Sequence, residues 1–228
     1  MEKSLTVPIA ICIAGVVVAG AVYFAVSSQE PSTSSGTGNP ALVRPVGPSD
    51  HILGNPTAPV KIVEYADFDC EYCKGFDASL HQIVATEGSS GQVAWVYREF
   101  PLVEIHPGAM KHAEAAECVA QTSGNDAFWK FADSLFANQP VDPSRYGALA
   151  EAAGVTNGDA FAHCYANAST TVDARITADR QNAFDSGARG TPYSLILVAG
   201  QAPVVMDGAY SYDAAKQLVD NALAETQH

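Results

Sequence analysis

The apolar residues change their spacing along the chain, and these changes predict alternating strands and helices. Residues 60–66 are almost continuously apolar and rich in β-branched side chains, which is typical of a strand buried on both faces. Apolar residues then recur at helical spacing from 73 to 84, and Gly88 can end that helix. Residues 92–100 predict a second strand, with alternate side chains facing opposite ways, which Pro101 ends. The folded chain is therefore expected to begin as strand, helix, strand.

A block of helices follows and separates these elements from a second group of strands. Between residues 107 and 186 the apolar positions keep helical spacing in five segments, with capping signals such as Gly154 between them. Strand signals return at 193–198 and 204–206, joined by a short turn, and Ser211 can cap a last helix. The predicted fold class is α/β, with an all-helical subdomain inserted between a β-α-β unit and a β-β-α unit.

The N-terminal stretch bears on the cellular compartment. Residues 7–26 carry no charge, and twenty helical residues span ~30 Å, the thickness of the hydrocarbon core of a bilayer. Residues 1–26 therefore predict a membrane anchor, or a cleaved signal peptide if the small residues Ala25-Val26-Ser27 form a cleavage site. Either alternative exports the rest of the chain to a compartment in which disulfides persist.

The remaining residues are expected to form a linker and a folded body. Residues 27–48 are rich in Ser, Gly, Thr and Pro, which predicts a flexible tether. A short edge strand is expected at 50–56. The folded body is expected to comprise a first part of the main domain at 49–106, the helical insertion at 107–186 and a second part of the main domain at 187–228.

The net charge of the chain limits the classes of partner that it is expected to bind. It carries 12 Lys and Arg against 25 Asp and Glu, a net charge of −13 over 228 residues. Such a surface repels phosphate backbones, so nucleic acid is not an expected partner. The hydrophobic content of 47% is that of a folded protein rather than a disordered one.

The candidate chemistry lies where the first strand meets the first helix. Cys70 and Cys73 are separated there by two residues, so both sulfurs can share one turn and form a disulfide. Cys70 is expected at the helix N-terminus, where unpaired N–H groups and the macrodipole favour a thiolate. The pair could instead be half of a structural zinc site, but the sequence has no second Cys-x-x-Cys and no ligand-spaced histidine pair. A redox-active dithiol is the favoured interpretation.

Four segments together resemble a known family. They are Gly54-Asn55-Pro56, the run from Glu64 to Cys73 (EYADFDCEYC), Tyr97-Arg98-Glu99-Phe100-Pro101-Leu102 and Gly190-Thr191-Pro192. With the order of elements, they resemble the thioredoxin fold with a helical insertion, and more closely the DsbA-like thiol-disulfide oxidoreductases of the membrane-anchored type. The resemblance implies an exported, disulfide-forming oxidase with no cofactor and no metal. A disulfide reductase, an isomerase or a non-catalytic binding module on the same fold are the alternatives.

The resemblance also implies partners and roles for individual residues. The substrates would be reduced, unfolded exported proteins, and a quinone-linked thiol oxidase in the membrane would recycle the enzyme. Thr191 and Pro192 would form a cis peptide bond facing the disulfide, with Cys70 exposed and Cys73 buried. Glu64 would be a buried acid that exchanges a proton with Cys73; the alternative is a structural ion pair between Glu64 and Lys61 or another base.

The two cysteines of the helical block form a second candidate pair. Cys118 and Cys164 both lie on apolar helix faces. In an exported protein this predicts a structural disulfide, with two buried free thiols as the alternative.

Acidic residues surround the first cysteine of the redox pair. Asp67, Asp69 and Glu71 place negative charge close to Cys70, which is expected to disfavour its thiolate. The chain is therefore predicted to be a weaker oxidant than the family members that carry histidine between the cysteines.

Overall fold

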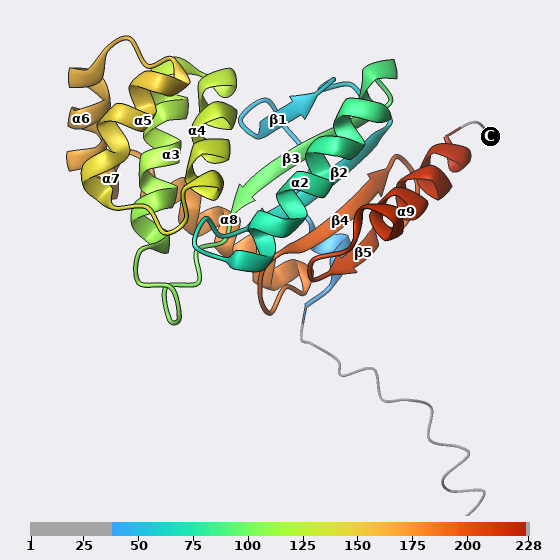
Figure 1. The fold of residues 1–228 in the computed structure, drawn as a ribbon. Helices are drawn as coiled ribbons and strands as arrows, with labels where there is room; N and C mark the ends of the chain where they lie inside the picture. Colours follow the sequence, from blue (N-terminus) through green and yellow to red (C-terminus); the bar gives the residue numbers. More distant parts are fainter. Residues whose placement is uncertain (1–37, 227–228) are drawn as a thin grey trace, which may run out of the picture. The chain divides into compact units, whose positions relative to one another are not determined.

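Five strands form one mixed sheet through the middle of the folded chain (Figure 1). Their spatial order is β1-β3-β2-β4-β5. The strands are β1 (His51–Gly54), β2 (Val60–Ala66), β3 (Val93–Glu99), β4 (Tyr193–Val198) and β5 (Val204–Asp207). β2 pairs in parallel with β3, and the other neighbours pair antiparallel. The central position of β2 explains its continuous apolar run, because both of its faces are covered.

The structure is a computed structural model and describes residues 38–226. The predicted anchor or signal peptide at 1–26 and the first part of the predicted linker lie outside the described residues. In the described range, every helix is too short or too polar to cross a bilayer.

Helices cover both faces of the sheet. α2 (Glu71–Thr86) and α9 (Tyr212–Glu225) pack against one face, and α8 (Asp173–Ser186) packs against the other (Figure 1). Trp95 and Tyr97 on β3 face the large core beneath α2, whereas Val96 between them belongs to the smaller core on the opposite side. The side chains of β3 thus alternate as its sequence predicts.

The helical insertion lies beside the β1 edge of the sheet, where α4 contacts β1 (Figure 1). Its helices before α8 are α3 (Ala109–Ser123), α4 (Asn125–Ala137), α5 (Tyr146–Ala153), α6 (Gly158–Ala166) and α7 (Ala168–Thr171). Short 3-10 turns occur at η1 (Pro40–Leu42), η2 (Gly88–Ser90) and η3 (Pro143–Arg145). The one-turn helix α7 was not expected from the sequence. It forms because the helical segment between α6 and α8 is broken at Asn167 and again at Val172, whose backbones are not helical.

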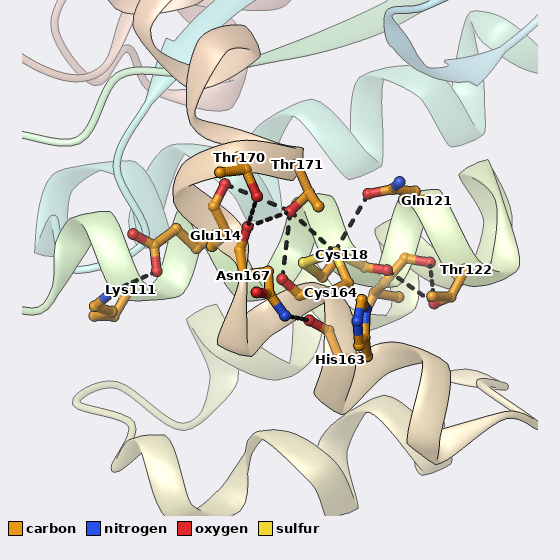
Figure 2. The surroundings of a disulfide bond; sticks show 12 residues. Lys111, Glu114, Cys118, Gln121, Thr122, His163, Cys164, Asn167, Thr170 and Thr171 are labelled. Atoms are coloured by element: carbon orange, nitrogen blue, oxygen red, sulfur yellow. Dashed lines mark hydrogen bonds and ion pairs between the residues drawn. A yellow bond between two sulfur atoms is a disulfide. The ribbon is translucent and has the colours of Figure 1, made fainter.

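A disulfide joins two helices of the insertion. The sulfurs of Cys118 on α3 and Cys164 on α6 are 2.02 Å apart, and the Cα atoms are 5.7 Å apart. The Thr171 hydroxyl and the Gln121 side chain lie against the Cys164 sulfur (Figure 2). The bond ties α3, which packs on α4, to a helix that follows it 46 residues later.

Candidate active site

The two cysteines of the Cys-x-x-Cys pair lie at the start of α2. Cys70 is the N-cap residue with an extended backbone, and Cys73 lies in the first turn. Both are free thiols in the structure. Cys73 is fully buried, as the resemblance implies, but Cys70 is only 4% exposed, so the expectation of an exposed Cys70 is wrong. The Thr191 carbonyl lies against its sulfur, and the Gln139 side chain donates a hydrogen bond to its backbone oxygen, so segments distant in sequence cover it.

The environments of the two sulfurs push their pKa values in opposite directions. A hydrogen bond from Cys73 is the largest influence that lowers the pKa of Cys70 to about 6, and Thr191 and the N–H groups of Tyr72 and Cys73 add to it against the effect of burial. Burial raises the pKa of Cys73 well above its usual value, and the hydrogen bond to Cys70 and the charge of Glu64 raise it further. Cys70 is therefore suited to be a thiolate while Cys73 keeps its proton.

The segment before β4 completes one side of the site. The peptide bond between Thr191 and Pro192 is cis. The Cys70 sulfur lies 3.4 Å from the Thr191 carbonyl oxygen, although the two residues are 121 positions apart. The structure thus brings Thr191 and Pro192 beside the cysteine pair.

Glu64 is buried in β2 on the side of the large core. It is 1% exposed, and Trp95 Nε1 donates a hydrogen bond of 3.0 Å to its Oε2 atom. Its Oε1 atom has no hydrogen-bond partner among the described residues. Burial raises the pKa of Glu64 well above its usual value, and the charge of Asp77 raises it further. A carboxyl that is protonated in this position can give a proton to a thiolate of Cys73 and, once ionised, can take it back.

The alternative assignment for Glu64, an ion pair with Lys61, is wrong. The Lys61 ammonium donates a hydrogen bond of 2.6 Å to the backbone oxygen of Ala58. Two residues three positions apart on a strand point their side chains to opposite faces of the sheet. Lys61 therefore cannot reach the Glu64 carboxyl. The partner that sequence analysis missed is Trp95, one of the large apolar residues of β3.

Two of the three acids around Cys70, Asp67 and Asp69, contact histidines that sequence analysis did not include in the site. Asp67 Oδ2 accepts a hydrogen bond from the Leu102 N–H and lies 2.8 Å from His106 Nδ1. Asp69 Oδ1 lies 2.9 Å from His112 Nε2. Each of these two acids thus has an imidazole partner in the folded chain. The pKa of Cys70 is lowered to about 6 in the folded chain, so the expectation of a disfavoured thiolate is wrong.

His106 lies in the loop before α3 and His112 in the first turn of α3, and the chain between them approaches the active site closely. A Cβ atom on Gly108 would lie 2.8 Å from Asp69 Oδ2 and 3.3 Å from His112 Nε2, so only glycine fits there without displacing the pair. The Tyr146 hydroxyl contacts the other ring nitrogen of His112. The sequence signal for this site was weak, since each histidine meets an acid about 40 positions earlier in the chain.

Comparison with protein-family models identifies the family of the chain. A family model described as Thioredoxin matches residues 47–221, which include both strands that flank the cysteine pair and the cis-proline segment. The chain belongs to the thioredoxin family. The match continues through the helical insertion, so this thioredoxin-family chain carries its active-site elements on two sides of an inserted subdomain.

Solved structures of other family proteins share the fold. The α-DsbA1 protein of Wolbachia pipientis is 21% identical, with a TM-score of 0.68, over 82% of this chain and 96% of that one. BdbD of Bacillus subtilis is 23% identical, with a TM-score of 0.66, over 77% of this chain and 93% of that one. At these identities the likeness concerns the fold, which is thioredoxin-like with a helical insertion, as the sequence predicts.

Curated relatives match parts of their own length. A probable disulfide bond formation protein D of Bacillus cereus is 32% identical over 95 residues, which are 41% of this chain and 43% of that protein. Na(+)/H(+) antiporter NhaA 1 of Salinispora arenicola is 32% identical over 191 residues, 82% of this chain. The chain spans 27% of the length of that antiporter and 16% of NhaA 3 of Salinispora tropica. The similarity to the antiporters therefore covers a segment of each.

Proposed function

We propose that this thioredoxin-family protein is an exported thiol-disulfide oxidoreductase that introduces disulfides into other proteins. The observation that supports the proposal most is the difference between the two sulfurs, with the pKa of Cys70 lowered to about 6 and that of Cys73 raised. An enzyme that holds its reduced form as a stable thiolate is a stronger oxidant, because formation of that thiolate drives electrons from the substrate to the enzyme.

The proposed reaction transfers two electrons from a dithiol substrate to the oxidised pair. A substrate thiolate attacks the sulfur of Cys70, the Cys70–Cys73 bond breaks, and Cys73 leaves as a thiolate that takes a proton from Glu64. A second thiolate of the substrate then attacks the substrate sulfur of the mixed disulfide. This step forms the substrate disulfide and releases Cys70 as a thiolate. Hydrogen bonds from Cys73 and from the N–H groups of Tyr72 and Cys73 stabilise that thiolate.

The surroundings of Cys70 support binding of an extended substrate segment. The backbone of Thr191, the residue before the cis-proline, lies beside the sulfur, where a peptide could pair with it as an added strand. Reduced, unfolded exported proteins are the proposed substrates. A quinone-linked thiol oxidase in the membrane is the proposed partner that returns the pair to the disulfide state.

The proposed location is the extracytoplasmic face of the cell membrane, with residues 1–26 as the anchor or as a cleaved signal peptide. The test is labelling of intact cells with a thiol reagent that cannot cross the membrane. The Cys73→Ser variant, which leaves Cys70 unpaired, should be labelled in intact cells and not only after lysis. Labelling only after lysis would place the domain in the cytoplasm.

The proposed activity is tested by refolding a reduced, unfolded protein with several disulfides. We expect the oxidised enzyme to restore activity to that substrate, and Cys70→Ser to abolish the effect. With a substrate that already contains a disulfide, such as insulin, Cys73→Ser should accumulate a mixed disulfide, because its Cys70 thiolate attacks that bond, one substrate thiolate leaves, and no Cys73 is present to resolve the product; a non-reducing gel shows it. An insulin-reduction assay separates the alternatives. Activity there without activity in refolding would indicate a reductase, and inactivity in both assays would indicate a binding module.

A further inference from the structure

Three side chains outside the cysteine pair gather on the side of α2 that faces α4. Asp77 and His81 are four residues apart on α2 and therefore lie on the same helix face, and Asp133 reaches them from α4 of the helical insertion. One donor atom of each lies within 4.8 Å of the other two. Together with Lys74 and Phe136 they line a hollow of about 330 Å³.

The histidine ring is held in place by aromatic packing. It meets the ring of Trp95 edge-on, with 5.2 Å between centroids and 88° between planes, and the ring of Trp129 at 6.3 Å and 79°. Its Nε2 atom lies 2.9 Å from Asp133 Oδ1 and 3.8 Å from Asp77 Oδ2. One ring nitrogen therefore faces both carboxylates, in the place where a cation replacing the Nε2 proton would meet all three donors.

The exposure of the three side chains leaves room for further ligands. The relative exposures are 14% for Asp77, 34% for His81 and 47% for Asp133, so the group is buried on the α2 side and open toward solvent on the α4 side. Water could complete the coordination from the open side, as it does in sites with three protein ligands.

We propose that Asp77, His81 and Asp133 form a binding site for a divalent transition metal of the Zn²⁺ type. One imidazole nitrogen with two carboxylate oxygens suits Zn²⁺ and similar borderline ions. The same set is less suited to Ca²⁺, which takes six to eight oxygen ligands. Pairs at i and i+4 on one helix can hold a metal jointly, because their side chains project in the same direction.

The three proposed ligands come from two parts of the fold, so a bound metal would link them. Asp77 follows Cys73 by one helical turn, and Asp133 belongs to the insertion. A metal bound by all three would tie the active-site helix to the insertion at this point. Metal binding should therefore raise the unfolding temperature of the oxidised protein as well as give a direct binding signal.

Zinc titration of the full-length, oxidised chain tests the proposal. The oxidised state is required because free thiols of Cys70 and Cys73 would themselves bind zinc. We expect one site by competition with a chromophoric chelator, and at least a tenfold loss of affinity in His81→Ala and in Asp133→Asn. His163→Ala, which removes an exposed histidine on α6, is the matched control and should bind as the wild type does.

Further variants and metals distinguish a specific site from general attraction to an acidic protein. Asp133 is half exposed, so Asp133→Asn keeps the fold even if the aromatic packing of His81 makes His81→Ala unstable. Lys74→Ala removes a cation from the rim and should tighten binding. Co²⁺ should give d–d absorption bands of an imidazole–carboxylate site that disappear in Asp133→Asn. Equal zinc affinity in wild type and Asp133→Asn, absence of binding to the oxidised wild type, or tighter binding of Ca²⁺ than of Zn²⁺ would each overturn the proposal.

Discussion

The sulfur of Cys70 lies 3.4 Å from the carbonyl oxygen of Thr191, the residue before the cis-proline. The contact joins the start of the active-site helix to the segment that leads into β4, on the far side of the helical insertion in the sequence. It places the backbone of Thr191 next to the reactive sulfur. The Cys70 sulfur thus meets a backbone from a distant part of the sequence, whereas the Cys73 thiol is fully buried.

Alkylation of the reduced enzyme should follow the titration of Cys70. Because the pKa of Cys70 is lowered to about 6, we expect its reaction rate with iodoacetamide to rise with pH and reach half its maximum near pH 6. An ordinary cysteine would do so near pH 8.5. Cys73→Ala removes the largest influence on this pKa, and its midpoint should move to higher pH. A midpoint near 8.5 in the wild type would contradict the assignment of Cys70 as a stabilised thiolate.

The same titration predicts how the stability of the reduced protein depends on pH. The pKa of Cys70 is lower in the folded state than in the unfolded state, so the unfolded chain binds more protons between the two values. The thiolate stabilises the reduced fold fully at pH 9 and above, and this contribution is lost as the pH falls toward 6. The oxidised protein lacks the thiolate. Urea unfolding of both forms at pH 5 and pH 8 should show that the free energy of unfolding rises more for the reduced form than for the oxidised form between these pH values.

Glu64→Gln should slow the steps in which Cys73 gains or loses a proton. Glutamine keeps the shape and can still accept the hydrogen bond from Trp95, but it cannot titrate. We expect the rate of reduction of the oxidised enzyme by a dithiol, followed by stopped-flow fluorescence, to fall on the order of tenfold to a hundredfold. The alkylation midpoint of Cys70 should change much less. An unchanged rate of reduction would assign Glu64 a structural role only.

Glu71→His tests the influence of the residue that follows Cys70. Replacing a negative charge by an imidazole in the first turn of α2 should stabilise the Cys70 thiolate and make the enzyme more oxidising. The redox equilibrium with glutathione should shift about tenfold for each unit by which the pKa of Cys70 falls. Glu71→Gln separates loss of charge from gain of the imidazole. A histidine variant no more oxidising than the wild type would refute the prediction that Glu71 limits oxidising strength.

The same substitution carries a cost in helix stability. An acid in the first turn interacts favourably with the helix macrodipole, so its loss is expected to cost about 0.5 kcal/mol. Thermal unfolding of the oxidised variant measures this term, since no thiolate is present in that state.

Removal of the disulfide in the insertion should destabilise the whole described domain. Cys118→Ala with Cys164→Ala opens a loop whose ends are 46 residues apart, and the chain-entropy estimate for such a loop is about 4 kcal/mol. Urea unfolding of the oxidised enzyme measures the loss. In a Cys70→Ala, Cys73→Ala background, reduction acts on this disulfide alone and should reproduce the effect. A stability equal to that of the wild type would show that packing of α3 against its neighbours holds the insertion without the bond.

The sequence alone determined the elements that rest on local chemistry. The β-branched run of β2, the helical spacing of α2 and the Cys-x-x-Cys pair between them were predictable, because strand period, helix period and cap position are properties of neighbouring residues. The resemblance carried by the Thr191-Pro192 segment extended this to a cis peptide bond on the far side of the insertion.

Only the tertiary structure decided which side chains surround the cysteine pair. His106 from the loop after β3 meets Asp67, and His112 on α3 meets Asp69. Trp95 meets Glu64 across two paired strands. These contacts join positions 31 to 43 residues apart, and no spacing rule along the chain encodes them. The charge near Cys70 was therefore misjudged from sequence, because a carboxylate's influence on a thiol depends on the partners that the folded chain brings to it.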